Sequence, residues 1–119
     1  MDSFGHEKLH VYQAALEYVG FVYNLAWRLK GYHRHARDQL LRASQSIPLN
    51  IAEGNGKSGT ADRRRFFEIA RGSALECAAI QDVLLVGKAI SIDESDLGKQ
   101  LLLRIVSMLT KLSQVKNES

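Results

Sequence analysis

The sequence predicts an all-α protein: one domain over residues 1–119, folded as an up-down-up-down antiparallel four-helix bundle. Three observations lead to this prediction. Apolar residues recur at intervals of three and four along nearly the whole chain, which is the period of an amphipathic helix. Glycine-containing turns interrupt that pattern three times, near residues 31, 54–59 and 87. The connections are short, and short connections force sequential helices to run antiparallel.

The first helix is expected over residues 8–30. Lys30 and Gly31 predict its end, because a cation suits the negative end of a helix and glycine readily adopts a left-handed cap. The apolar residues that step by three and four predict its buried stripe, which comprises Leu9, Tyr12, Leu16, Val19, Tyr23 and Ala26.

The second helix is expected over residues 36–57 and contains Pro48, the single proline of the chain. A proline removes one backbone donor and crowds the carbonyl four residues back, at a cost of about 3 kcal/mol. Two arrangements are open. Either one helix stops near Ser46 and another starts at Pro48, or one long helix bends and the Ser44 or Ser46 hydroxyl serves the freed carbonyl. The predicted stripe is Leu40, Leu41, Ser44, Ile47 and Ile51.

The third helix is expected over residues 60–86, with Thr60 as N-cap, Asp62 in the first turn and Gly87 at the end. Its predicted stripe is Phe66, Ile69, Ala70, Ser73, Cys77, Ile80 and Leu84. The fourth helix is expected over residues 92–115, opened by a capping box of Ser91 and Glu94. Its predicted stripe is Leu97, Leu101, Ile105, Met108, Leu112 and Val115.

The composition is that of a soluble globular protein, with 45% hydrophobic and 24% charged residues. No apolar run approaches the roughly 18 residues of a membrane span, and no secretory signal is recognisable. The single cysteine, Cys77, excludes an internal disulfide. These features predict a cytoplasmic protein.

The basic residues are concentrated in the middle of the chain. Residues 28–65 hold nine Lys or Arg against three acids, whereas the remainder is net negative. Lys57 and Arg63–Arg65, with Arg34 and Arg37, are therefore candidates for nonspecific contacts to nucleic-acid phosphates. A solvated surface run, with Arg64 paired to Glu68, is the alternative. Three arginines near a helix N-terminus oppose its dipole, so the stability of their own helix does not account for them.

Candidate catalytic and metal-binding patterns are weak. The H-E-x-x-H zinc pattern is matched by His6, Glu7 and His10, but no third ligand lies within reach. We therefore interpret the match as chance. A metal-dependent hydrolase stays only as a third hypothesis. Glu7 and His10 also match one di-iron ligand pair, but no second copy exists. Cys77 is expected in the core, and Asn50 with Glu53 is expected to form a polar clamp on the second helix. No catalytic residue, metal or cofactor is predicted.

Three segments carry a resemblance to a known family. The run from Arg42 to Gly54 resembles the signature R-A-x-x-S-I-P-x-N-I-A-E-G of the four-helix-bundle family called 23S rRNA intervening-sequence proteins. Residues 9–15 are similar to its opening L-x-V-[WY]-Q-x-A, and residues 66–76 to its F-L-x-I-A-x-G-S-x-x-E. The pattern residues that this resemblance carries over are Arg42, Ser46, Pro48, Asn50, Glu53, Gly54, Gly72, Ser73 and Glu76.

The resemblance implies a non-enzymatic bacterial cytoplasmic protein that assembles into a ring, typically a homopentamer. A related branch of the family serves diversity-generating retroelements as an accessory protein, in which a basic ring engages reverse transcriptase and RNA. The leading expectation is therefore an oligomeric protein that binds RNA or a ribonucleoprotein through a basic surface. The alternative is a protein-only scaffold that docks an acidic partner.

Overall fold

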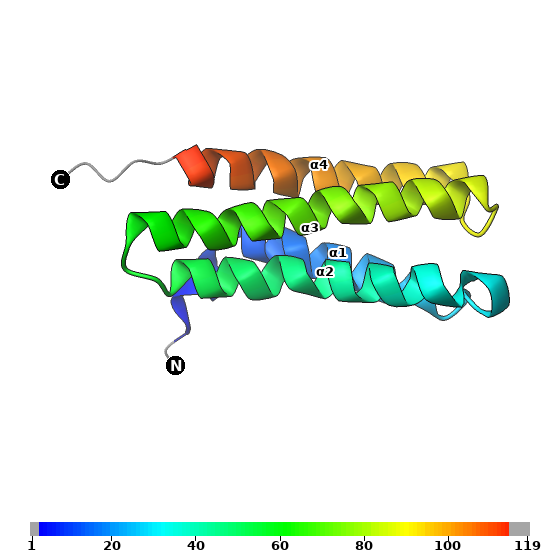
Figure 1. Cartoon of the computed structure of the whole chain (residues 1–119), viewed down its shortest axis with the longest axis horizontal. Coiled ribbons are helices and arrows are strands. Elements are labelled where there is room, and N and C mark those ends of the chain that lie inside the picture. The colour runs from blue at the N-terminus through cyan, green and yellow to red at the C-terminus, as the bar shows by residue number, and fades with distance from the viewer. Residues whose placement is uncertain (1–2, 115–119) are drawn as a thin grey trace.

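The computed structural model describes residues 3–114 and confirms the all-α prediction. Four long helices pack side by side, α1 and α3 running one way and α2 and α4 the other (Figure 1). The elements are η1 (Gly5–Lys8), α1 (His10–Ala26), η2 (Gly31–His33), α2 (Arg34–Asn55), α3 (Thr60–Val86) and α4 (Ile92–Gln114), where η marks a 3₁₀ helix. We call the two ends of the bundle the α2–α3 end and the α1–α2 end. The α3–α4 turn lies at the α1–α2 end.

The predicted bounds of α3 are confirmed, and those of α2 differ from the observed bounds by two residues at each end. α4 begins at Ile92 as predicted and runs to Gln114. Its predicted last residue, 115, lies outside the described residues. The first helix is shorter than predicted. Leu9 has an extended backbone and separates η1 from α1. After Ala26 the amides of Arg28 and Leu29 bond to carbonyls three residues back, and the Leu29 side chain is buried. The chain thus turns early to bury Leu29, and Gly31, with its φ of 60°, begins η2 rather than ending α1.

Pro48 lies inside one continuous helix, so the first arrangement, two separate helices, is wrong. The hydroxyls predicted to serve the freed Ser44 carbonyl have other partners. Ser44 Oγ donates to the Leu41 carbonyl at 2.9 Å, and Ser46 Oγ accepts from side chains described below. Pro48 itself is buried beside Ile47, and this burial of apolar surface offsets the lost backbone bond.

The core confirms four of the five residues of the stripe predicted for α2, since Leu41 is only partly buried, and it corrects the other three stripes. In α1 the buried residues are Val11, Ala14, Ala15, Tyr18, Val22 and Leu25, whereas Leu16 and Tyr23 are about half exposed. α1 is apolar on most of its surface, so periodicity alone allowed two stripes. Packing selects the one with the small Ala14 and Ala15, which let neighbouring helices approach. Phe66, Ile69 and Ser73 in α3, and Leu97 and Met108 in α4, are likewise less buried than predicted.

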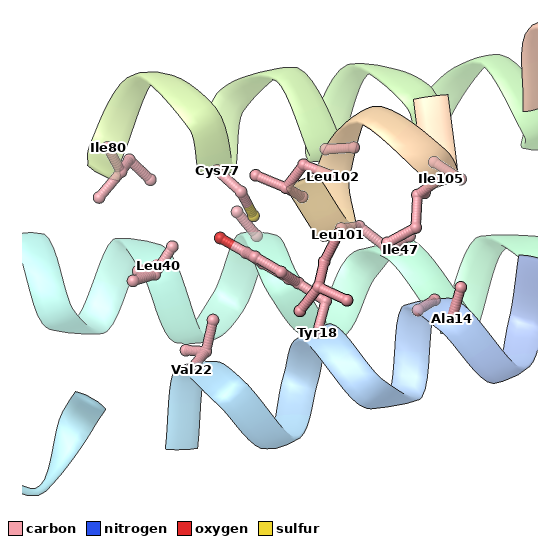
Figure 2. Packing of buried hydrophobic residues seen from close by; sticks show 14 of the residues in the cluster. Ala14, Tyr18, Val22, Leu40, Ile47, Cys77, Ile80, Leu101, Leu102 and Ile105 are labelled. Atoms are coloured by element: carbon pink, nitrogen blue, oxygen red, sulfur yellow. The ribbon is translucent and has the colours of Figure 1, made fainter. Parts of the chain in front are cut away.

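A polar network lies inside this apolar core. The Tyr18 hydroxyl donates to Gln81 Oε1 at 2.5 Å, and Gln81 Nε2 donates to the Ser95 carbonyl at 3.1 Å. The hydroxyl also points toward the Cys77 sulfur (Figure 2). Tyr18, Cys77 and Gln81 are fully buried, which confirms Cys77 as a core residue. Burial raises the pKa of the Tyr18 hydroxyl and raises the pKa of the Cys77 thiol to about 12, so both are protonated at neutral pH.

The helix ends confirm one predicted cap and correct another. Ser91 and Glu94 form the predicted capping box, with reciprocal bonds of 2.9 and 3.1 Å to each other's backbone amides. The bond from the Ser91 amide, followed by that from Arg28, lowers the pKa of the Glu94 carboxyl. Thr60 is not an N-cap: Gly59 occupies that position, and Thr60 is the first helical residue. No helix within residues 3–114 is long and apolar enough to cross a membrane.

Candidate nucleic-acid interface

Arg63 and Arg64, at the start of α3, bond to the ends of the two neighbouring helices. Arg63 Nη1 donates to the carbonyls of Asn55 and Lys57 at 3.0 and 3.2 Å, just where α2 ends. Arg64 Nε donates to the Ser113 carbonyl in the last turn of α4 at 3.0 Å. Since neighbouring helices are antiparallel, the negative C-terminal ends of α2 and α4 lie beside the N-terminus of α3. These arginines are thus stabilised by neighbouring helices, and the alternative pairing of Arg64 with Glu68 does not occur.

Lys57 and Arg65 flank one aromatic ring at the same end. Lys57 Nζ lies 5.2 Å and the Arg65 guanidinium carbon 4.8 Å from the centroid of the Phe66 ring. Arg63 is likewise 5.5 Å from the centroid of the Phe67 ring. Such contacts hold a cation in place through the ring's negative face and leave its charge intact.

Little negative charge opposes this cluster. Within residues 3–114 no carboxylate oxygen lies within ion-pair distance of Arg63, Arg64 or Arg65. The sole ion pair at the cluster joins Lys57 Nζ to Glu53 Oε2 at 3.9 Å, and both side chains are exposed, so it is weak. We call Lys57 and Arg63–Arg65 the basic cluster.

Arg34 and Arg37 do not join the basic cluster. They lie at the start of α2, and the helix from Arg37 to its last residue, Asn55, is about 27 Å long. Arg37 is half-buried, pairs with Asp38 at 3.0 Å and donates to the Leu29 carbonyl at 3.2 Å. Arg34 is exposed. The six predicted residues are therefore divided between opposite ends of the bundle.

Two exposed aromatic residues near Arg34 were missed by the sequence analysis. Trp27 follows α1 and Tyr32 lies in η2, and both side chains project into solvent. The signal was present in the run from Trp27 to Arg37, where aromatic and basic residues alternate without an acid.

The resemblance pattern contains a hydrogen-bonded trio that joins α2 to α3. Asn50 Nδ2 donates to the carbonyl and to the Oγ of Ser46, at 2.8 and 3.0 Å. Ser73 Oγ donates to the same Ser46 Oγ at 2.8 Å. Ser46 therefore connects Asn50, one turn further along its own helix, with Ser73 on the neighbouring helix.

The expected clamp of Asn50 with Glu53 is wrong. Asn50 bonds to Ser46, whereas the Glu53 carboxylate is exposed and lies 3.9 Å from Lys57 Nζ. Gly54, in contrast, has a clear packing role. A Cβ at this position would lie 2.8 Å from Phe67 Cε1, so the close approach of α2 to α3 requires glycine.

Three further pattern residues lie on the surface. Arg42, Gly72 and Glu76 are all exposed, and a Cβ built on Gly72 would meet no described atom within 4 Å. Unlike Gly54, Gly72 therefore has no packing role within the described part of the single chain.

His6 and His10 are not on one helix, because His6 lies in η1 and His10 begins α1 after the extended Leu9. The His6 ring packs against Phe4 and the edge of Tyr12. In the described residues no group of three or more His, Cys, Asp or Glu side chains is placed to hold a metal ion. The zinc-pattern spacing is therefore not realised as a helical metal site.

Comparison with solved structures shows the same fold in a known protein. A crystal structure at 1.70 Å of a protein of unknown function from the S23 ribosomal protein family of Bacteroides thetaiotaomicron VPI-5482 is similar to this chain. Its TM-score is 0.81 and its identity 22%, and the match covers 88% of this chain and 99% of that chain. At this identity the likeness establishes the fold.

Comparison with sequences identifies the family. No curated protein matches. The model of the 23S rRNA-intervening sequence protein family matches residues 7–111, a span that includes all three segments of the resemblance. Neither the name of this family nor that of the similar structure designates an enzyme. The chain therefore belongs to the family of 23S rRNA-intervening sequence proteins.

Proposed function

We propose that this protein is a non-enzymatic accessory protein of the bacterial cytoplasm that binds RNA, alone or in a ribonucleoprotein, through the basic cluster. The observation that carries the proposal is the unneutralised charge of that cluster. Arg63 and Arg64 bond to backbone carbonyls and Arg65 to an aromatic face, and these partners carry no net charge. A phosphate approaching this end meets four positive charges and two exposed acids, namely Glu53, which is weakly paired with Lys57, and Asp62 in the first turn of α3.

The residues of the basic cluster have different roles, and these roles suit phosphate binding. Arg63 is partly buried and anchors the end of α2, so its role is to hold the surface in shape. Arg65 is exposed and the Lys57 side chain is partly exposed, and both lie close to the Phe66 ring, which restricts them. Restricting a long side chain before binding lowers the entropy lost when it contacts a phosphate.

The binding we propose is not sequence-specific. The described part of the chain offers no sheet of aromatic residues and no recognition-helix motif near the basic cluster. Contacts to phosphates position a nucleic acid without reading its bases. The affinity should accordingly depend strongly on salt.

The experiment is an anisotropy titration of labelled RNA at two salt concentrations. It compares the unmodified protein to a double variant that carries both Lys57→Ala and Arg65→Ala. We expect weaker binding at low salt and a salt slope smaller by about two, one for each lost phosphate contact. Arg104→Ala is the matched control, because Arg104 is an exposed arginine on α4 near Glu17 and outside the cluster. RNA binding that is absent at low salt, or equal in the double variant and the control, would refute the proposal. A protein partner retained after nuclease treatment would instead favour the scaffold that docks an acidic partner.

We further propose that the protein acts as a homo-oligomer, a ring such as the homopentamer that the resemblance implies, assembled through the outer face of α3. This face carries Leu75 and Val83, which are 48% and 64% exposed, in line with Gly72 and Ala79 at helical spacing. α3 is therefore apolar on the outside as well as toward the core. A glycine within a helix costs about 1 kcal/mol relative to alanine, and close approach of a second chain is the reason we propose for Gly72.

Light scattering tests the assembly with Gly72→Arg. Since the site is open in the single chain, we expect the arginine to leave the helical circular dichroism unchanged and to reduce the mass to that of a monomer. Gln100→Arg, on the exposed surface of α4, is the control and should keep the mass of the unmodified protein. An unmodified protein that is monomeric at all concentrations tested would refute the assembly.

Repetition of the basic cluster around a ring would convert a weak site into strong binding of one strand.

A further inference from the structure

We propose that the α1–α2 end is a second nucleic-acid site, which takes the unpaired nucleotides of a single-stranded RNA by stacking their bases on Trp27 and Tyr32. This inference rests on the proposed RNA binding but concerns different residues, at the opposite end of the bundle. The tertiary structure leaves both aromatic rings in water, although Trp27 directly follows α1 and Tyr32 lies within η2.

The exposure of these two rings is unusual for this protein. Tyr32 is fully exposed and Trp27 is 79% exposed, more than any other aromatic side chain of the described residues. The backbone that carries them is nevertheless held in place. Leu29, between them, is buried, and its carbonyl accepts a bond from Arg37. The segment between α1 and α2 that carries both rings is therefore held in one conformation, which lowers the entropic cost of binding a base.

The charges around the rings suit a phosphate backbone. Residues 27–37 contain four Lys or Arg and no acid. Two of these cations are occupied, because Arg28 bonds to Glu94 at 2.5 Å and Arg37 to Asp38. Lys30 and Arg34 remain exposed, each within two positions of Tyr32. A basic residue thus lies on either side of an exposed ring, as a strand with alternating bases and phosphates requires.

The α3–α4 turn extends this surface. A Cβ built on Gly87 would lie 3.7 Å from His33 Cε1, so this turn and η2 are in contact. Lys88 follows with a φ of 60°, a left-handed conformation that is costly for any residue except glycine. It lines an open cleft of about 620 Å³ with an apolar wall that includes Ile90 and Ile92. The cleft therefore offers an apolar surface for a further base and one more cation.

The acids at this end limit the surface on one side. Glu94 lines the cleft but is held by Arg28 and by the Ser91 amide, so its charge is largely compensated. Asp93 and Asp96 are exposed on the first turns of α4. The strand would accordingly pass along the α1–α2 connection and the Lys88 side of the cleft, away from Asp93 and Asp96.

Stacking selects unpaired nucleotides. In an A-form duplex the bases are already stacked on one another, and protein side chains contact mainly its backbone and minor groove. The flat faces of Trp27 and Tyr32 are useful only to bases that are free of a helix, and every base has such a face. The inferred ligand is thus a single strand, bound with little preference for its sequence.

Trp27 is the single tryptophan of the chain, so its fluorescence reports on this site alone. The experiment titrates the protein with a uridylate oligomer of about 12 nucleotides, the size of an ordinary single-strand site. We expect saturable quenching with the oligomer and none with an RNA duplex at the same phosphate concentration. The Lys57→Ala, Arg65→Ala double variant should retain the quenching, because its substitutions lie at the other end of the bundle.

Variants at the rings provide the second measurement, by anisotropy of the labelled oligomer. Trp27→Ala and Tyr32→Ala should each weaken binding of the single strand about tenfold and leave binding of the duplex unchanged. Phe4→Ala is the matched control, since Phe4 is an aromatic residue that is 73% exposed and precedes η1, whose Gly5 lies beside Asn55 at the end of α2. Trp27→Phe should restore most of the affinity, because phenylalanine also offers a flat face.

The outcomes separate this inference from the proposed function. If RNA binds but Trp27 is not quenched, or if the duplex quenches it equally, the stacking site is refuted while RNA binding stands. Fluorescence that changes with protein concentration alone would show that a second copy covers Trp27 and would also refute the site. If no RNA of either kind binds, both proposals fail.

Discussion

Replacing Gln81 by alanine is expected to lower the free energy of unfolding by about 3–5 kcal/mol, the largest effect that we predict for a single substitution. Gln81 is fully buried, and its side chain connects Tyr18 on α1 with the Ser95 carbonyl on α4. Alanine leaves a cavity and deprives the buried Tyr18 hydroxyl of its acceptor. Since a domain of this size is stable by about 5–15 kcal/mol, such a loss is a large share of the total.

Urea unfolding followed by circular dichroism measures this effect. The control is Gln100→Ala, an exposed position on α4, which should change the stability by less than about 0.5 kcal/mol. Tyr18→Phe alone should also destabilise, because it orphans Gln81 Oε1. Combined with Gln81→Leu, however, it should cost less than the sum of the two single changes, since neither partner is then left unpaired. Strict additivity would contradict the network.

Gly98→Ala is expected to destabilise the protein by about 2–3 kcal/mol, the second largest effect. A Cβ at this position would lie 2.7 Å from Phe21 Cε2 and even closer to Gln81 Oε1. The Gln81 amide cannot turn aside without losing its bonds to Tyr18 and Ser95, so α4 must move away from α1 and α3. The loss outweighs the gain in helix propensity, which is at most about 1 kcal/mol for glycine to alanine.

Gly20→Ala is the matched control for this prediction, because Gly20 is also helical but has no neighbour within 4 Å of the added Cβ. It should stabilise the protein by about 0.5–1 kcal/mol. A coupling test follows from the geometry. In the Gln81→Ala background the Cβ at residue 98 enters vacated space, so Gly98→Ala should cost much less there than in the unmodified protein. An equal cost in both backgrounds would show that the contact with Gln81 does not limit position 98.

The basic cluster shows why local reasoning about charge was incomplete. Considered along the sequence, Arg63–Arg65 oppose the dipole of their own helix, which left two explanations open: contact with a phosphate ligand, or a solvated surface run with Arg64 paired to Glu68. In the structure, Arg63 and Arg64 stabilise the ends of α2 and α4, which are remote in sequence from each other. Arg34, in contrast, was grouped with these arginines by charge but lies at the other end of the bundle. The distribution of charge along the sequence therefore predicted which basic residues are candidates. The directions of the helices decided at which end of the bundle each of them lies.

The sequence by itself determined the number, order and direction of the helices, because apolar periodicity, glycine turns and the Ser91–Glu94 capping box are local signals. It also determined the family, through the run around Pro48. Only the tertiary structure decided which face of α1 is buried, since that helix has two apolar stripes and the choice depends on the residues packed opposite. The same holds for the Tyr18–Gln81 network and for the exposure of Trp27: both depend on contacts between helices, which no local pattern encodes.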